Sequence, residues 1–193
     1  MKKVCGILWG LSIWMSCGHG LPSKELNVVS HHVAKESEMK SRKDWLVLAK
    51  QDKIEFSKNF FNALNPETMD LVDIFYHPDA KFIDPIGRHD GVVSIKNYYR
   101  SIYGPVTEIH FSFDEPFMSK DQLALPWKMT FCSSKLNRGE PIVVDGLSRI
   151  KFHPETHQAI YHRDYFDMGE MVYEKVPVLG FFIRWIKGRL KTE

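Results

Sequence analysis

The sequence predicts an α+β domain in which N-terminal helices precede and cover an antiparallel sheet. From Asp44 to Tyr103 the apolar residues recur mostly at helical spacing, whereas after Gly104-Pro105 apolar and polar residues alternate in segments separated by short turns. Helices first and strands second is the order typical of α+β domains. A chain of 193 residues that is 44% hydrophobic and 13% aromatic can build one such domain with a substantial core.

The helical part begins at Asp44, a candidate N-cap for a helix over 45–64 that Asn65-Pro66 ends. A shorter helix is expected over 67–76, and a third over 92–103, before Gly104-Pro105. The expected strands are 80–84, 107–113, 123–133, 141–152 and 159–166. With helices on one face, the sheet should curve into a cone with a pocket between the two layers.

The chain divides into four expected segments: a signal peptide over 1–20, a polar linker over 21–43, the α+β domain over 44–170 and a basic amphipathic helix over 171–193. Two lysines, an apolar stretch too short to span a bilayer and then small residues are the order of an export signal. We therefore expect an exported protein, periplasmic or associated with the envelope. A lipoprotein anchored at Cys17 remains an alternative, and a translation start at Met39 would make the protein cytoplasmic.

Composition and motifs argue against several classes of function. The formal net charge is +2 and the cations are scattered except at the ends, so a nucleic-acid partner is not expected. There is no phosphate-binding glycine loop or dinucleotide fingerprint, and Pro154 prevents a helical zinc arrangement of His153 and His157. We expect no cofactor and no metal.

One carboxylate stands out, because Asp84 lies in the run Phe82-Ile83-Asp84-Pro85-Ile86-Gly87 at the end of a predicted strand. Apolar neighbours desolvate a carboxyl group and raise its pKa towards values useful for proton transfer. An Asp before Pro is also a common turn residue, so a purely structural role stays open.

The segment 80–87, followed by Gly91 and an aromatic helix, resembles ketosteroid isomerase and the SnoaL-like members of the nuclear transport factor 2-like superfamily. The resemblance covers about Asp44 to Asp167, and the segments 163–167 and 177–180 are similar to an uncharacterised bacterial branch. It implies a cone-shaped, cystatin-like fold. Because this scaffold hosts isomerases, cyclases, dehydratases, hydrolases and proteins without known chemistry, it leaves the activity open.

The same resemblance makes Asp84 the counterpart of the base that shuttles a proton beside a carbonyl. The tyrosine that stabilises the oxyanion falls on Phe60, which has no hydroxyl, and the second oxyanion group falls on Ser148 or on Asp145, in registers that differ by an odd number of residues. Steroid isomerisation is therefore not expected, because an enolate needs a stabiliser as well as a base.

The last strand adds a second set of candidates. Alternation puts Ile160, His162, Asp164 and Phe166 on one face, and if this face lines the pocket, His162 and Asp164 look across it towards Asp84. Two acids and a histidine in a dry cavity can supply an acid and a base; a hydrogen-bonded structural pair is the alternative. Trp127, Met129 and Phe131 share one face of another strand and would form an apolar wall.

The tail over 176–191 has apolar residues at helical spacing opposite Arg184, Lys187 and Lys191. Such a helix could lie on an anionic membrane, cover the pocket or pack on a partner subunit. The exposed outer sheet face makes a homodimer plausible. Two functions are compatible with these features. The first is an acid/base enzyme (isomerase, cyclase, dehydratase or hydrolase) for a small apolar carbonyl or hydroxyl compound, in which Asp84, Asp164 and His162 are catalytic and the ligand is surrounded by Phe60, Trp127, Met129, Phe131, Ser148 and Phe166. The second is a non-catalytic ligand-binding or envelope-associated interaction module.

Overall fold

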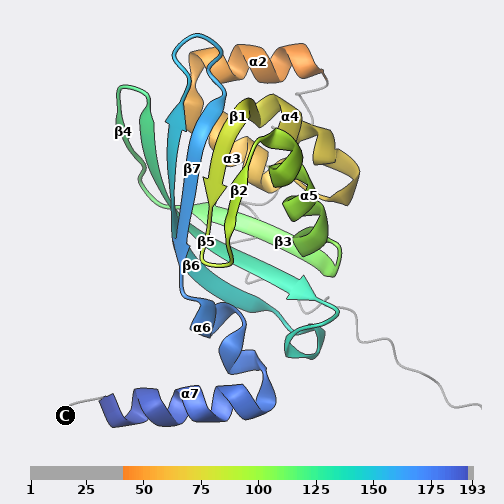
Figure 1. Cartoon of the computed structure of the whole chain (residues 1–193), viewed down its shortest axis with the longest axis vertical. Helices are drawn as coiled ribbons and strands as arrows, with labels where there is room; N and C mark the ends of the chain where they lie inside the picture. Colours follow the sequence, from red (N-terminus) through yellow and green to blue (C-terminus); the bar gives the residue numbers. More distant parts are fainter. Residues whose placement is uncertain (1–40, 191–193) are drawn as a thin grey trace, which may run out of the picture.

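The computed structural model describes residues 41–190 and confirms the expected α+β fold with a curved sheet (Figure 1). The expected signal peptide and nearly all of the expected linker lie outside these residues.

The described residues form one seven-stranded sheet, in the order β2-β1-β7-β6-β5-β3, with β4 paired to β5. Neighbouring strands are antiparallel except β1 and β7, which run parallel. The strands are β1 (Tyr76–Ile83), β2 (Arg88–Asp90), β3 (Val106–Phe113), β4 (Phe117–Ser119), β5 (Gln122–Ser133), β6 (Ile142–Phe152) and β7 (Ala159–Phe166).

The expected single helix over 45–64 is wrong, because the chain breaks it into α2 (Arg42–Gln51) and α3 (Lys53–Ala63). Asp52 has extended backbone dihedrals, and its carboxylate accepts the free N–H groups of Ile54 and Glu55 at the start of α3. The cap of α2 is Ser41 rather than Asp44, whose carboxylate instead bonds back to Ser41 in a capping box.

The helix expected over 67–76 is also different in the structure. It consists of a 3₁₀ helix, η1 (Pro66–Leu71), and one turn, α4 (Val72–Phe75), after which Tyr76 already belongs to β1. Apolar periodicity does not separate these forms, because a short 3₁₀ segment and an α-helical turn bury nearly the same side chains. The third helix, α5 (Val92–Tyr103), has the predicted bounds.

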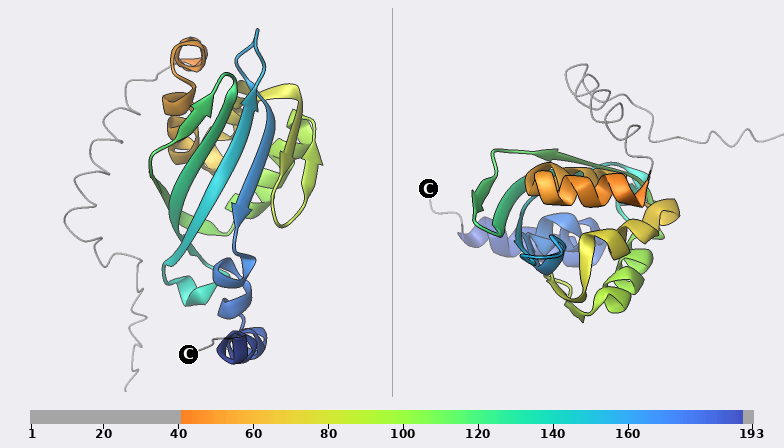
Figure 2. Two further views of the ribbon diagram at one scale, coloured as in Figure 1. Left: turned by 90° about the vertical axis from the view of Figure 1, so that its left-hand side faces the viewer. Right: turned by 90° about the horizontal axis from the view of Figure 1, so that it is seen from above.

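The core lies between the concave face of the sheet and the helices, which Figure 2 shows filling the hollow of the sheet in the view from above. Phe60 of α3 and Phe75 of α4 are fully buried and stack with ring centroids 4.0 Å apart. This aromatic layer joins α3 to the first strand through Tyr76.

The chain leaves the sheet through α6 (Met168–Met171) and η3 (Tyr173–Lys175) and ends in α7 (Pro177–Leu190), which lies apart from the sheet (Figure 1). A further 3₁₀ turn, η2 (Asn137–Gly139), joins β5 to β6. Within residues 41–190, no helix is both long and apolar enough to cross a bilayer.

Candidate functional site

A cavity of about 240 Å³ lies between the sheet and the helices α3, α5 and α6. Its wall is apolar and strongly aromatic. The side chains that line it include Phe61, Phe82, Asp84, Tyr98, Tyr99, Tyr103, Phe111, Trp127, Met129, Phe131, Asp164, Phe166, Met171 and Val172.

Asp84 lies at the edge of this cavity, immediately after β1. Its Oδ1 atom accepts the backbone N–H groups of Ile86 and Gly87, each at 2.8 Å, so the residue does form the turn that an Asp-Pro sequence favours. Its Oδ2 atom accepts the hydroxyl of Tyr98 from α5. Asp84 is thus both a turn residue and a cavity carboxylate.

Tyr98 is held in this position by its surroundings. Its ring stacks on His89 of β2 with centroids 4.0 Å apart. Burial raises the pKa of Tyr98 well above its ordinary value, and the neighbouring Asp84 carboxylate, which is hydrogen-bonded to the phenol, raises it further. The phenol therefore stays protonated and donates to Asp84.

Asp164 lies next to Asp84 on the neighbouring strand. The parallel pairing of β1 with β7 places Phe82 beside His162 and Ile83 beside Arg163, so the next position brings Asp84 level with Asp164. The two acids therefore come from neighbouring strands of one wall, and not from opposite walls as the sequence suggested. Both line the cavity, and the Asp164 side chain is 14% exposed.

The Oδ1 atom of Asp164 is held by two donors from behind. Ser148 Oγ donates to it at 2.5 Å, and Nε2 of the fully buried His162 lies 2.8 Å away. Trp127 Nε1 in turn donates to Ser148 Oγ at 2.9 Å. Among the described residues nothing hydrogen-bonds to Oδ2 of Asp164, which leaves this oxygen available to a ligand.

The hydrogen bonds behind Asp164 continue to two tyrosines. His162 Nδ1 is 2.5 Å from Tyr76 Oη, which is 2.9 Å from Tyr99 Oη. Burial raises the pKa values of Tyr76 and Tyr99 well above the ordinary range, so both phenols remain protonated. In the tautomer in which His162 Nε2–H donates to Asp164, Nδ1 accepts from Tyr76 and Tyr76 accepts from Tyr99.

The other sequence candidates divide into two groups. Trp127, Met129, Phe131 and Phe166 line the cavity. Phe60, Ser148 and His162 are fully buried and lie behind the wall, outside the set of residues that line it.

Two questions of register are also answered. Ser148 faces inward on β6, whereas the Asp145 side chain is 73% exposed and pairs with Lys128 at 3.0 Å on the outside of the sheet. Ile160 does not share the inner face with His162; it lines a groove on the outer surface with Lys81 and Arg149. The cause is a register shift between Lys151 and Phe152, which changes the alternation at the start of β7.

The tyrosines Tyr76, Tyr98, Tyr99 and Tyr103 are the site residues that the sequence reasoning missed. The spacing of Ile95, Tyr99 and Tyr103 on α5 puts these residues on one helix face, which could have indicated that Tyr99 and Tyr103 point inward. Tyr76 carried no such signal, because it stands at the junction of a helical turn and a strand.

No group of three or more His, Cys, Asp or Glu side chains within residues 41–190 is placed to hold a metal ion. The residues that line the cavity are two acids, three tyrosines, Ser133 and otherwise apolar or aromatic side chains.

Solved structures that share this fold include the three that follow. A hypothetical protein with a ketosteroid isomerase-like fold from Catenulispora acidiphila, solved in complex with trimethylamine, has a TM-score of 0.52 and 14% identity, over 62% of this chain and 88% of that one. Putative SnoaL-like polyketide cyclases from Shewanella denitrificans and Shewanella putrefaciens have TM-scores of 0.53 and 0.54, with 18% and 15% identity. They cover 62% and 73% of this chain and 92% and 99% of theirs.

A sequence search of the curated proteins finds no significant match. The model of the SnoaL-like domain family matches residues 58–162, which is more than half of the chain and extends from α3 to β7. Together with the fold, this match shows that the chain belongs to the SnoaL-like domain family.

Proposed function

We propose that the domain binds a small, largely apolar carbonyl or hydroxyl compound in the cavity and moves a proton on it by carboxylate chemistry. The observation that carries the proposal is that Asp84 and Asp164 are the only charged residues lining the cavity, within the part of the chain described. Proton transfer between a carboxylate and such a ligand requires no cofactor. Isomerisation, cyclisation and dehydration can begin with a step of this kind, whereas in hydrolysis the carboxylate takes the proton from an attacking water molecule.

The hydrogen bonds assign different roles to the two acids. Both oxygens of Asp84 already accept bonds, from the turn and from Tyr98, so this residue is better suited to orienting the Tyr98 hydroxyl. Asp164 has one oxygen held by Ser148 and His162 and one oxygen open to the cavity. We therefore assign the proton-transferring role to Asp164, whereas Asp84 holds Tyr98 in place at the cavity wall.

His162 lies behind the wall and acts in this scheme through Asp164, which makes it a positioning residue.

Deuterium exchange into a small apolar ketone, 2-tetralone in D₂O, tests the proposal. A carboxylate takes the proton next to the carbonyl, the C–H bond breaks to give the enolate, and a deuteron from solvent then bonds to the carbon. We expect the wild-type protein to accelerate this exchange and Asp164→Asn to reduce the acceleration by roughly 10²–10⁴-fold, the usual contribution of a general base.

Asp145→Asn is the matched control, because Asp145 lies on the adjacent strand β6 but faces outward. It should leave the exchange rate unchanged. The assignment would be contradicted if both variants lost the exchange. It would also be contradicted if Asp164→Asn kept the wild-type exchange rate while its circular dichroism spectrum stayed native. Native mass spectrometry of the purified protein would then identify what occupies the cavity.

A second candidate function is non-catalytic binding of a cationic ligand. Both charges on the wall are negative, and Trp127, Tyr98 and Phe82 are among the aromatic rings beside them, a combination that attracts alkylammonium groups. The neighbour from Catenulispora acidiphila was solved with trimethylamine. Calorimetric binding of tetramethylammonium that disappears in Asp84→Asn and in Asp164→Asn, without any exchange of ketone protons, would favour this function over the first.

A further inference from the structure

We propose that α7 is an interfacial helix that docks this protein on the surface of a lipid bilayer containing anionic phospholipids. The proposal concerns a surface separate from the cavity and does not depend on the proposed chemistry. It rests on which side of the helix is apolar, on where that side points and on the charges of the helix.

The helix exposes an unusually large apolar surface. Seven of its side chains are at least 42% exposed, although each is large and apolar, and they come from every turn of the helix. At about 100° per residue they cover about half of the circumference. These side chains are Val178, Leu179, Phe181, Phe182, Trp185, Ile186 and Leu190.

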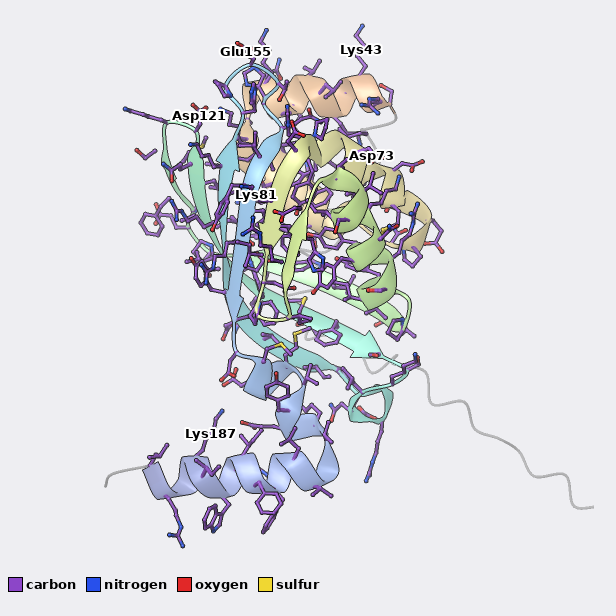
Figure 3. The ribbon with its side chains drawn as sticks, viewed as in Figure 1. Lys43, Asp73, Lys81, Asp121, Glu155 and Lys187 are labelled. Atoms are coloured by element: carbon purple, nitrogen blue, oxygen red, sulfur yellow. The ribbon has the colours of Figure 1, made fainter. Side chains whose placement is uncertain are left out.

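The opposite side of α7 is held against the segment that precedes it. Lys187 Nζ lies 2.7 Å from a carboxylate oxygen of Glu174, and Arg184 donates to the Glu174 carbonyl at 3.0 Å. Gly180 is buried here, and a Cβ atom at this position would collide with the Glu174 backbone. Figure 3 shows Lys187 on the side of α7 that faces the rest of the protein. The polar contacts thus turn the apolar face outward.

The charges of the helix suit an anionic surface. Residues 177–190 contain no acid; Arg184 and Lys187 lie on the side that contacts Glu174, and Arg189 is the cation on the apolar side. Arg189 lies on the exposed side, with its guanidinium 4.4 Å from the centroid of the Trp185 ring. A tryptophan with an adjacent arginine is well placed at the level of lipid headgroups, where the ring is partly buried and the cation meets phosphate.

A lipid surface fits this face better than a second copy of the chain. A seam between two helices needs a narrow apolar stripe, whereas this face is about twice as wide and carries a cation within it. The helix is also too short to span a bilayer. It would therefore lie in the plane of the interface.

The first test follows Trp185 itself in the full chain. Vesicles of phosphatidylcholine with about a quarter phosphatidylglycerol are prepared with and without brominated acyl chains, which quench nearby tryptophan. The chain has five tryptophans, so the difference between wild type and Trp185→Phe isolates the signal of Trp185. We expect a blue shift and strong quenching, weaker with phosphatidylcholine alone. An unquenched Trp185 would overturn the proposal, even if another segment of the chain binds the vesicles.

The second test measures the partition coefficient between buffer and vesicles for Phe181→Ser/Phe182→Ser. Each phenyl ring should contribute enough buried area for the double variant to bind the vesicles at least about tenfold more weakly. Phe117→Ser is the matched control, because Phe117 is about as exposed as Phe181 (69% and 61%). Phe117 lies on β4, on another surface of the protein. Equal losses in both variants would contradict the role of α7. Light scattering that shows a dimer in wild type and a monomer in Phe181→Ser/Phe182→Ser would instead identify a second copy as the occupant and overturn the lipid assignment.

Discussion

Gly146→Ala is the perturbation that most directly tests how the cavity wall is held. Gly146 of β6 lies opposite Trp127 of β5, and a Cβ atom at this position would overlap the six-membered ring of the indole. The ring is buried and cannot swing into solvent without leaving the wall. Because Trp127 donates to Ser148, a displaced ring also loses the bond that helps to orient the donor to Asp164.

The expected cost has two parts. Overpacking a closely packed wall costs about 1–3 kcal/mol. Losing the hydrogen bond from the indole adds about 0.5–1.5 kcal/mol. We therefore expect the free energy of unfolding to fall by about 1.5–4.5 kcal/mol, measured by urea denaturation with one common m-value fitted to both variants.

Gly188→Ala is the matched control, since a Cβ atom at Gly188 in α7 meets no other atom within 4 Å. It should leave the stability of the domain unchanged or raise it by up to about 1 kcal/mol, because alanine is a better helix former. A Gly146→Ala protein as stable as wild type would refute the reasoning. It would mean that Trp127 is free to move and that the contact between the two strands does not hold the wall.

Two further predictions concern the aromatic core. The pKa values of Tyr76 and Tyr99 are raised by burial above the ordinary value of 10.0, so the folded state holds these protons more tightly than the unfolded chain. Their contribution to stability is complete below pH 10 and is lost as the pH rises beyond it. The urea midpoint of unfolding should therefore fall steeply above pH 10. Phenolate absorbance from Tyr76 and Tyr99 should appear only when the protein unfolds. Titration of all seven tyrosines in the native protein near pH 10 would contradict this. Phe60→Tyr should lower stability by about 1–3 kcal/mol without restoring an oxyanion donor, because Phe60 is fully buried against Phe75 and lies outside the cavity lining; thermal melts and the ketone exchange assay check both parts.

Much of the sheet could be predicted because its signals are local. The bounds of α5 and β7 agree with the predicted ranges, since a glycine precedes α5, another ends it, and β7 follows a clear turn. The break at Asp52 was missed because its flanking helices continue the same apolar period, and only the cap hydrogen bonds distinguish an interruption from a continuous helix. The parallel pairing of β1 with β7 depends on strands more than 75 residues apart, which no local pattern records.

The candidate site divides in the same way. From its own residues the sequence determined that Asp84 ends a strand in an apolar setting, that Asp164 and His162 share a face of the last strand, and that the tail can form an amphipathic helix. Only the tertiary structure decided that Asp84 and Asp164 are neighbours, that His162 stands behind Asp164 and that Tyr98 donates to Asp84. The physical reason is that side-chain direction along a strand or helix is a local property, whereas the atoms that meet depend on the pairing of distant strands and on the helices packed over them.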